Sequence, residues 1–150
     1  MIKEIVMRIV KYWLDYTKSL SIIHMSGGML YNTLIDIYPK ADIVYTDNIY
    51  YLATQKTMDH LLGINFFKFA KYEEGWRDCD DYSYGAMGLM RWVVPAFCFG
   101  IVHVNISTGG KHALNFFMDD KKRLYYFEPQ TNKITLFAIK RSYKPYRFII

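Results

Sequence analysis

FCFGIVHVNISTGGKHALNFFMDDKKRLYYFE, residues 97–128, is the stretch that decides the fold of this chain. Three apolar runs within it are rich in β-branched and aromatic residues, and they cover residues 97–106, 112–118 and 124–128. Gly109-Gly110 and the segment from Asp119 to Lys122 separate these runs with residues that favour turns. The pattern predicts an antiparallel meander, and residues 134–139 predict its fourth strand.

A helix is expected directly before this meander. Asp78 is of a residue type that caps helix N-termini, and Pro95 ends the pattern. Between them, apolar residues recur at helical spacing at Tyr82, Ala86, Leu89, Met90 and Val93. Cys79 therefore falls in the first turn of the helix, where unpaired N–H groups and a partial positive charge favour a thiolate.

The N-terminus predicts an amphipathic helix over residues 2–20, followed by a break at Gly27-Gly28. Charged residues alternate with the apolar ones along this sequence and fall mostly on the other helix face, so it has the pattern of neither a secretory signal nor a membrane span. Elsewhere no uncharged run reaches the roughly 18 residues that a span needs. We therefore expect a protein without a membrane span.

Further elements are expected between this helix and the meander. Apolar runs at residues 43–46 and 49–52 flank Asp47-Asn48, which tolerates turn conformations, and together they predict a hairpin. Thr54 is the expected N-cap of a short helix that ends at Gly63. The Phe-rich segment 64–70 predicts another strand.

Length and composition fit one domain of the α+β class. The chain has 150 residues, of which 52% are hydrophobic and 22% charged, so it is long enough to bury a core of its own. It contains no repeat, low-complexity tract or Ser/Pro-rich linker. Helices that precede an antiparallel sheet are typical of α+β proteins, and residues 1–150 are read as a single domain.

Charge and cysteine content limit which binding partners and which cellular compartment are expected. The formal net charge is +5, but the longest basic run is Lys121-Lys122-Arg123, so nucleic acid is not expected as a partner. Two cysteines, Cys79 and Cys98, are too few for the disulfide framework of a small secreted protein. We expect a reducing, cytoplasmic location.

Cys79, His112 and Glu128 occur in the order of a papain-type thiol hydrolase. An imidazole can take the proton of a thiol, and a carboxylate beyond it can fix the imidazole tautomer. If residue 119 pairs with residue 122 in the turn, His112 stands opposite residue 129. Glu128 is then within one residue of facing His112, and the three residues are the predicted catalytic set.

Other interpretations of these residues remain open. A cysteine near a helix start is often a small buried hydrophobic residue, and Cys98, within PAFCFG, is expected to be inert core. His103 lies inside an apolar strand, where it is either a hydrogen-bonded sheet residue or the working base in place of His112. Neither Gln55 nor Gln130 stands at the spacing from Cys79 that papain-type enzymes use for an oxyanion donor.

Several short motifs resemble the C-terminal protease domain of the mushroom agglutinin (MOA-related) family, which also occurs in stand-alone viral and phage proteins. The residues that carry the resemblance are Trp76, Cys79 to Tyr82, Phe99 to Val102, His112 to Asn115 and Glu128 to Gln130. It covers roughly residues 40 to 138 and implies a papain-like fold with a protease core over residues 41–140 and a helical extension over residues 1–40. The sugar-binding β-trefoil of the mushroom protein is absent, so the resemblance implies no lectin activity.

The resemblance also implies calcium dependence and assigns roles. Cys79 is the implied nucleophile, His112 the general base and Glu128 the orienting acid. Asp80 and Asp81 are candidate calcium ligands, because carboxylates about 6 Å from a thiolate oppose it by roughly 3 kcal/mol at an effective dielectric near 20, and a bound cation cancels that charge. Both aspartates are equally explained as favourable charges at a helix N-terminus.

The expected function is therefore a calcium-assisted, papain-like cysteine protease that acts on a polypeptide substrate through an acyl-enzyme intermediate. An amidase acting on cell-wall or isopeptide bonds shares the same triad logic. The alternative from another class is a catalytically inactive papain-like viral protein that serves as a binding or self-association module, with a homodimer as one form. If the protein is viral, its expected location is the host cytoplasm.

Overall fold

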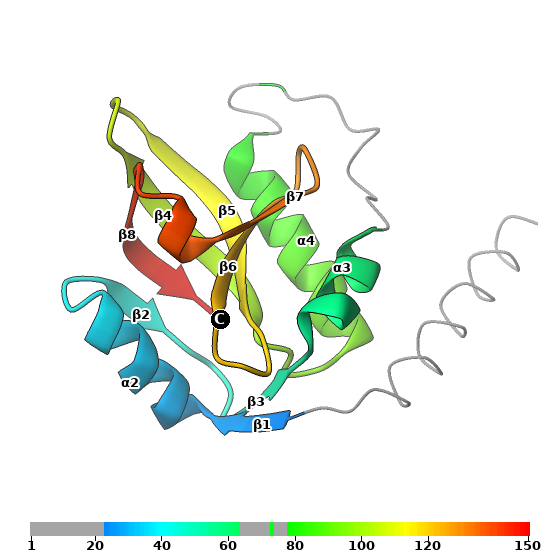
Figure 1. The fold of residues 1–150 in the computed structure, drawn as a ribbon. Coiled ribbons are helices and arrows are strands. Elements are labelled where there is room, and N and C mark those ends of the chain that lie inside the picture. Colours follow the sequence, from blue (N-terminus) through cyan, green and yellow to red (C-terminus); the bar gives the residue numbers. More distant parts are fainter. Residues whose placement is uncertain (1–22, 64–72, 74–77) are drawn as a thin grey trace, which may run out of the picture.

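A six-stranded mixed sheet forms the centre of the molecule, and a two-stranded sheet lies beside it (Figure 1). The computed structural model describes residues 23–63, 73 and 78–150. In spatial order the larger sheet comprises β2 (Asp42–Val44), β8 (Tyr143–Ile149), β4 (Phe99–Ile106), β5 (Lys111–Met118), β6 (Leu124–Glu128) and β7 (Lys133–Leu136). The smaller sheet pairs β1 (Ile23–Ser26) with β3 (Ile49–Leu52) in antiparallel fashion. The helices are α2 (Gly27–Ile37), α3 (Gln55–Gly63), α4 (Cys79–Val93) and the 3-10 turn η1 (Phe137–Ile139).

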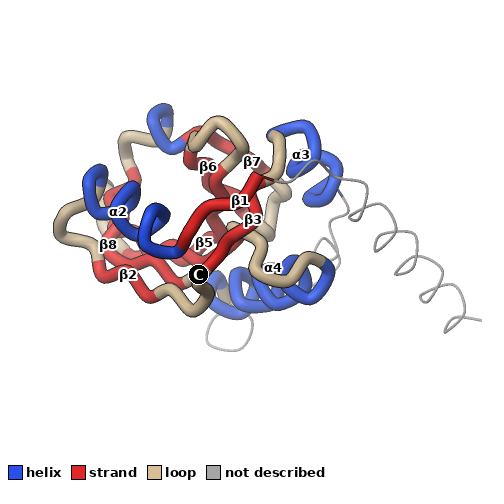
Figure 2. Tube along the Cα trace, turned by 90° about the horizontal axis from the view of Figure 1, so that it is seen from below, coloured by secondary structure: helices blue, strands red, loops and turns tan. Residues whose placement is uncertain are grey.

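The six-stranded sheet carries a hydrophobic core on each face, because successive side chains of a strand point to opposite sides. On one face Val102, Leu114 and Phe116 pack with Leu30 and Leu34 of α2. On the other face lies a second cluster, which contains Phe99, Phe117, Phe127, Ala86 and Met90, the last two from α4. Figures 1 and 2 accordingly place α2 and α4 on different sides of the strands. The near-continuous apolar runs of β4 and β5 follow from this burial on both faces.

The helix predicted after Asp78 is confirmed. The Asp78 side chain accepts a hydrogen bond from the backbone N–H of Asp80, and the side chain of Asp81 accepts one from the N–H of Asp78, which completes a capping box. The short helix α3 is capped as expected, since Thr54 Oγ1 accepts from the N–H of Thr57 at 3.1 Å. The helix expected over residues 2–20 and the strand expected over residues 64–70 lie outside the described residues.

The expected fold class, a papain-like α+β domain with N-terminal helices on an antiparallel sheet, is wrong. The large sheet is mixed and not antiparallel, because β2 runs parallel to β8, and a separate two-stranded sheet accompanies it. The hairpin expected around Asp47-Asn48 is also wrong. Its two strands belong to different sheets, since β2 pairs with β8 and β3 pairs with β1. Over the part of the chain that the structure describes, β-sheet dominates and helices are few.

The C-terminal strand β8, between β2 and β4, was not expected from the sequence. Pro145 argues against a strand in the middle of a sheet because it lacks an N–H donor. In the structure, the register between β4 and β8 shifts at this point, with His103 opposite Arg147 and Val104 opposite Pro145. The resulting bulge accommodates the proline. The segment expected as a strand over residues 134–139 divides into β7 and η1.

Gly100 on β4 gives a direct test of this packing. A Cβ at this position would meet the carbonyl oxygen of Ile149 and the ring of Phe116, so neither backbone nor core could yield easily. We expect Gly100→Ala to lower the free energy of unfolding by about 2 kcal/mol or more, as overpacking does. The measurement is chemical denaturation followed by circular dichroism.

Gly88→Ala is the matched control. Gly88 lies within α4, and nothing within 4 Å would contact an added Cβ. Since Ala is a better helix former than Gly, this variant should gain about 1 kcal/mol. Equal stability of the two variants would contradict the packing described for β4.

Candidate functional site

The His112 and Glu128 side chains form a direct pair across β5 and β6. His112 Nε2 lies 2.6 Å from Glu128 Oε2, and the two side chains are 18% and 20% exposed. Glu128 Oε1 accepts a hydrogen bond from the backbone N–H of Gln130 at 3.3 Å. The imidazole packs edge-on near the Tyr143 ring of β8, with ring centroids 6.2 Å apart. Of the residues predicted for the site, these two are brought together as expected.

The turn that places them differs from the predicted one. Residue 119 pairs with residue 123, not 122: Asp119 donates its N–H to the carbonyl of Arg123, and Lys122 takes a positive φ of 60°. Three-residue hairpin loops of this kind place a residue in the left-handed region before the strand resumes. A shift of one residue reverses the face of every side chain, so the predicted register would have put His112 and Glu128 on opposite faces. In the observed register, Asn115 stands opposite Phe127, and His112 and Glu128 share a face.

Cys79 is the first residue of α4, as predicted, but its thiol is not in a state that favours ionisation. Burial raises the pKa of Cys79, the carboxylates of Asp80 and Asp78 raise it further, and the backbone N–H of Ala113 opposes them. The sulfur lies 3.9 Å from Asp80 Oδ1. Among the described residues no hydrogen bond joins the thiol to His112; its strand contact is the amide of Ala113, one residue further along. The thiol is therefore protonated at neutral pH.

His103, the alternative base, lies on the side of the sheet that faces Cys79. Its Nε2 is 3.9 Å from Asp80 Oδ1, the same carboxylate oxygen that the thiol approaches. Burial lowers the pKa of His103, with a smaller lowering from Arg147, while Asp80 raises it. Its ring also packs near Tyr146 at 6.0 Å. Asp80 thus links the thiol to His103, and no comparable link to His112 exists within the described part of the chain.

A buried amide ties the start of α4 to the sheet. Asn115 of β5 donates from Nδ2 to the Ser83 carbonyl at 2.9 Å and to the Gly100 carbonyl at 3.1 Å. Ser83 in turn donates its hydroxyl to the carbonyl of Cys79 at 2.8 Å. These contacts fix the height of Cys79 over β5. Asn115 belongs to one of the sequence motifs, but its role could not be predicted because it depends on how α4 packs on β5.

Of the two aspartates expected as calcium ligands, Asp81 is a capping residue, whereas the Asp80 carboxylate contacts Cys79 and His103. Asp81 accepts the N–H of Asp78, and the N–H of Asp80 is bonded to Asp78. Within residues 23–63, 73 and 78–150, no group of three or more His, Cys, Asp or Glu side chains is arranged to hold a metal ion. Calcium ligation by Asp80 and Asp81 stays a prediction.

A small pocket opens next to the His112–Glu128 pair. It has a volume of about 180 Å³, and its lining comprises Leu114, Tyr126, Glu128, Thr131, Lys133, Thr135, Lys140 and Tyr143. Lys140 Nζ lies over the ring of Tyr143 at 4.8 Å from its centroid. Except for Glu128, this lining was not predicted from the sequence. Tyr143 belongs to β8, which was itself unexpected. Leu114 lies within the motif from His112 to Asn115 but was not assigned to a pocket, and the remaining residues belong to no motif.

No helix among the described residues has the length and apolar character needed to cross a membrane. Neither the family models nor the curated proteins include a match to this sequence.

Solved structures do match the fold. One is the PSL1a–E64 complex, which superimposes with a TM-score of 0.72 at 20% identity; the match covers 85% of this chain and 50% of the PSL1a chain. Another is the Polyporus squamosus lectin bound to the human-type influenza-binding epitope Neu5Acα2-6Galβ1-4GlcNAc, with a TM-score of 0.67 at 21% identity, covering 85% and 49%. This chain thus shares a fold found in a mushroom lectin. It spans about half the length of each of these neighbours.

These findings correct the expected function. Both neighbours are structures of a mushroom lectin, and one of them has a glycan bound. They do not support the function of a papain-like, calcium-dependent protease or hydrolase. The raised pKa of Cys79 and the lack of a bond to His112 among the described contacts agree with that correction. The expectation of a cysteine protease with a polypeptide substrate is therefore wrong, and the alternative expectation of a binding module fits better.

The ionisation of Cys79 can be measured by alkylation with iodoacetamide as a function of pH. Because the pKa of Cys79 is raised above its ordinary value, we expect a low alkylation rate at pH 7 that climbs only in the alkaline range, while Cys98, buried with a pKa of about 12, stays much slower. Asp80→Asn should increase the Cys79 rate at a given pH, because it removes a carboxylate that raises the thiol pKa.

Asp36→Asn, on the distant helix α2, serves as the charge-matched control and should leave the rate unchanged. A Cys79 rate that is already maximal below pH 7 would show an ion-paired thiolate and contradict a buried thiol with a raised pKa.

Proposed function

We propose that this chain is a binding module, and that it holds a small polar ligand in the pocket beside the His112–Glu128 pair. The observation that carries the proposal is the composition of the pocket wall. It combines a carboxylate at Glu128, hydroxyl groups at Thr131 and Thr135, and ammonium groups at Lys133 and Lys140. Donors and acceptors that converge on one concavity are the usual means by which proteins orient a polar ligand.

The pocket is held in shape before any ligand arrives. Glu128 is fixed from two sides, by His112 at one carboxylate oxygen and by the Gln130 amide at the other. Lys140 is positioned over the Tyr143 ring, which also gives the pocket a flat apolar wall. Groups fixed in this way lose little conformational freedom on binding, which favours affinity. A pocket of about 180 Å³ holds one ring of a ligand and leaves the remainder in solvent.

The bound compounds of the structural neighbours support a small polar ligand, since one neighbour is a complex with E64 and the other a complex with a sialylated trisaccharide. Identity near 20% over half of their length does not transfer either ligand to this chain. We therefore propose the ligand by its chemistry, as polar and ring-sized, and use both compounds as probes.

Other expectations stay predictions beside this proposal. The roles of Cys79 as nucleophile, His112 as base and Glu128 as orienting acid are untested, and so are a cytoplasmic location and a homodimer. Both cysteines are free thiols, which supports a reducing compartment.

Binding is measured by isothermal titration calorimetry of the full chain with each of the two probes. We expect at least one to bind, with Glu128→Gln and Tyr143→Ala each lowering its affinity about tenfold, because the first removes a charged acceptor and the second the aromatic wall. Tyr84→Ala, an exposed tyrosine on α4, is the matched control and should bind like the unaltered chain.

Intact-mass analysis of the samples with E64 distinguishes reversible binding from a covalent reaction at Cys79. A reversible complex with no mass gain supports the binding module. A covalent adduct lost in Cys79→Ala would contradict it in favour of the predicted thiol chemistry, and the absence of heat with both probes would count against the ligand class.

A further inference from the structure

A second, larger concavity lies between α3 and the β6–β7 edge of the sheet. Its volume is about 760 Å³, within the range of roughly 300–1,000 Å³ that is common for ligand sites. The residues that line it and not the smaller pocket are Gln55, Asp59, Arg123, Tyr125, Ile134, Leu136 and Ile139. Lys133, Thr135 and Lys140 line both. We call this concavity the α3–β7 groove.

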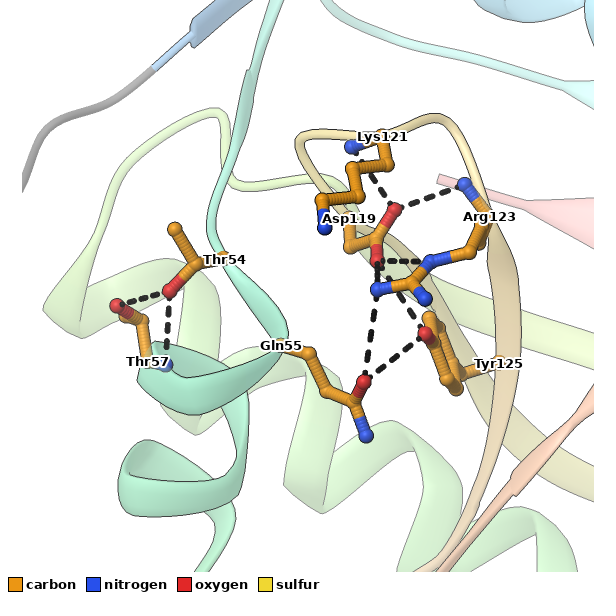
Figure 3. A network of polar contacts seen from close by, with 7 residues as sticks. All are labelled: Thr54, Gln55, Thr57, Asp119, Lys121, Arg123 and Tyr125. Atoms are coloured by element: carbon orange, nitrogen blue, oxygen red, sulfur yellow. Dashed lines mark hydrogen bonds and ion pairs between the residues drawn. The ribbon is translucent and has the colours of Figure 1, made fainter.

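The floor of the α3–β7 groove is built on a buried carboxylate (Figure 3). Asp119 is fully buried and accepts hydrogen bonds from the backbone N–H groups of Lys121 and Arg123, at 3.0 and 2.8 Å. Its other oxygen contacts Arg123 Nε at 2.7 Å, Arg123 Nη2 at 2.6 Å and the Tyr125 hydroxyl at 3.2 Å. The burial of a charge is costly unless it is paired and hydrogen-bonded, and here both conditions are met.

This network aims polar donors at the groove. Gln55 Oε1 accepts from the Tyr125 hydroxyl at 3.2 Å and lies 3.5 Å from Arg123 Nη2, so the carbonyl end of the amide faces the network and its NH₂ group faces away (Figure 3). Arg123 Nη1 makes no hydrogen bond within the described part of the chain. Arg123 Nη1 and Gln55 Nε2 are therefore donors that remain for a ligand, held in place by partners underneath.

The rest of the α3–β7 groove is partly cationic and partly apolar. Lys133 and Lys140 add two ammonium groups, and Asp59 is the acidic lining residue that opposes them. Ile134, Leu136 and Ile139 supply an aliphatic wall, and Ile139 is 72% exposed. Donors and cations beside an aliphatic wall match a ligand with an anionic head and an apolar body.

We propose that the α3–β7 groove binds a small amphipathic carboxylate. The carboxylate accepts hydrogen bonds from Arg123 Nη1 and Gln55 Nε2, and the apolar body of the ligand lies along Ile134, Leu136 and Ile139. The groove opens on the side of β6–β7 away from the His112–Glu128 pair, since Tyr125 and Glu128 point to opposite faces of β6.

The test uses three probes with the same tail: octanoate, octan-1-ol and octylammonium. Each is titrated into the ¹⁵N-labelled full chain, and shifts of backbone amide signals give affinity and location. We expect octanoate to bind about tenfold or more tightly than octan-1-ol, with octylammonium weakest, because the donors of the groove favour an anion. The shifted signals should belong to α3, β6 and β7.

Variants separate the head-group contact from the tail contact. Arg123→Lys keeps a cation against the buried Asp119 but loses the guanidinium fork, so it should fold and should lower octanoate affinity about tenfold without changing octan-1-ol. Gln55→Leu removes a donor without disturbing a buried charge and should act in the same direction. Ile139→Ser should weaken all three probes.

Two controls fix the interpretation. Lys144→Gln removes one positive charge on β8 and should leave octanoate binding unchanged, which distinguishes a local contact from a net-charge effect. Glu73→Gln removes one negative charge outside both concavities and should leave octanoate binding unchanged as well, while Glu128→Gln is titrated with the two probes of the smaller pocket, so that the two sites are judged separately. Equal binding of octanoate and octan-1-ol, or unchanged octanoate affinity in both Arg123→Lys and Gln55→Leu, would overturn the proposal.

Discussion

The side-chain amide of Asn115 makes the contacts that position α4, and with it Cys79, on the sheet. It lies fully buried between α4 and the sheet, and its two hydrogen bonds reach the Ser83 carbonyl on α4 and the Gly100 carbonyl on β4. Hydrogen bonds in a dry interior are directional and costly to lose. They therefore specify one position of α4 where apolar packing alone would permit several. Through Ser83, that position determines where Cys79 stands relative to β5.

Strand β6 contributes residues to the lining of both concavities. Alternate residues of β6 face opposite sides, so Glu128 and Tyr126 line the small pocket while Tyr125 lines the α3–β7 groove. Lys133 and Lys140 stand at the common border of the two. A change of register between β5 and β6 would exchange these linings together. The hairpin turn at Asp119, with its buried carboxylate, thus decides the chemistry on both faces.

Local sequence signals predicted much of the fold. The helix α4, its Asp78 cap and the strands β4, β5 and β6 follow from turn residues and from the period of apolar side chains. What failed was pairing over long distance. Nothing near Asp47-Asn48 indicates that β3 pairs with a strand formed by residues 23–26. Strand β8 was missed because Pro145 argues against a strand, and the bulge that accommodates the proline is seen only when β4 and β8 are paired. The sequence predicted that His112 and Glu128 lie together, but it did not predict the hairpin register that brings them to the same face.

The thiol of Cys79 illustrates why a correct position did not give the expected chemistry. A helix N-terminus favours a negative charge by about 0.3–1 kcal/mol, less than one unit in pKa. A carboxylate near 4 Å opposes a thiolate by roughly 4 kcal/mol at an effective dielectric of 20, and water around the exposed Asp80 side chain reduces that figure. Burial of the sulfur is the largest cause of the raised pKa of Cys79, the carboxylates of Asp80 and Asp78 add to it, and the backbone N–H of Ala113 opposes them. Asp78, which caps the start of α4, and Asp80, which follows Cys79, therefore help to keep the first residue of this helix protonated, so a position at a helix N-terminus did not by itself give a thiolate.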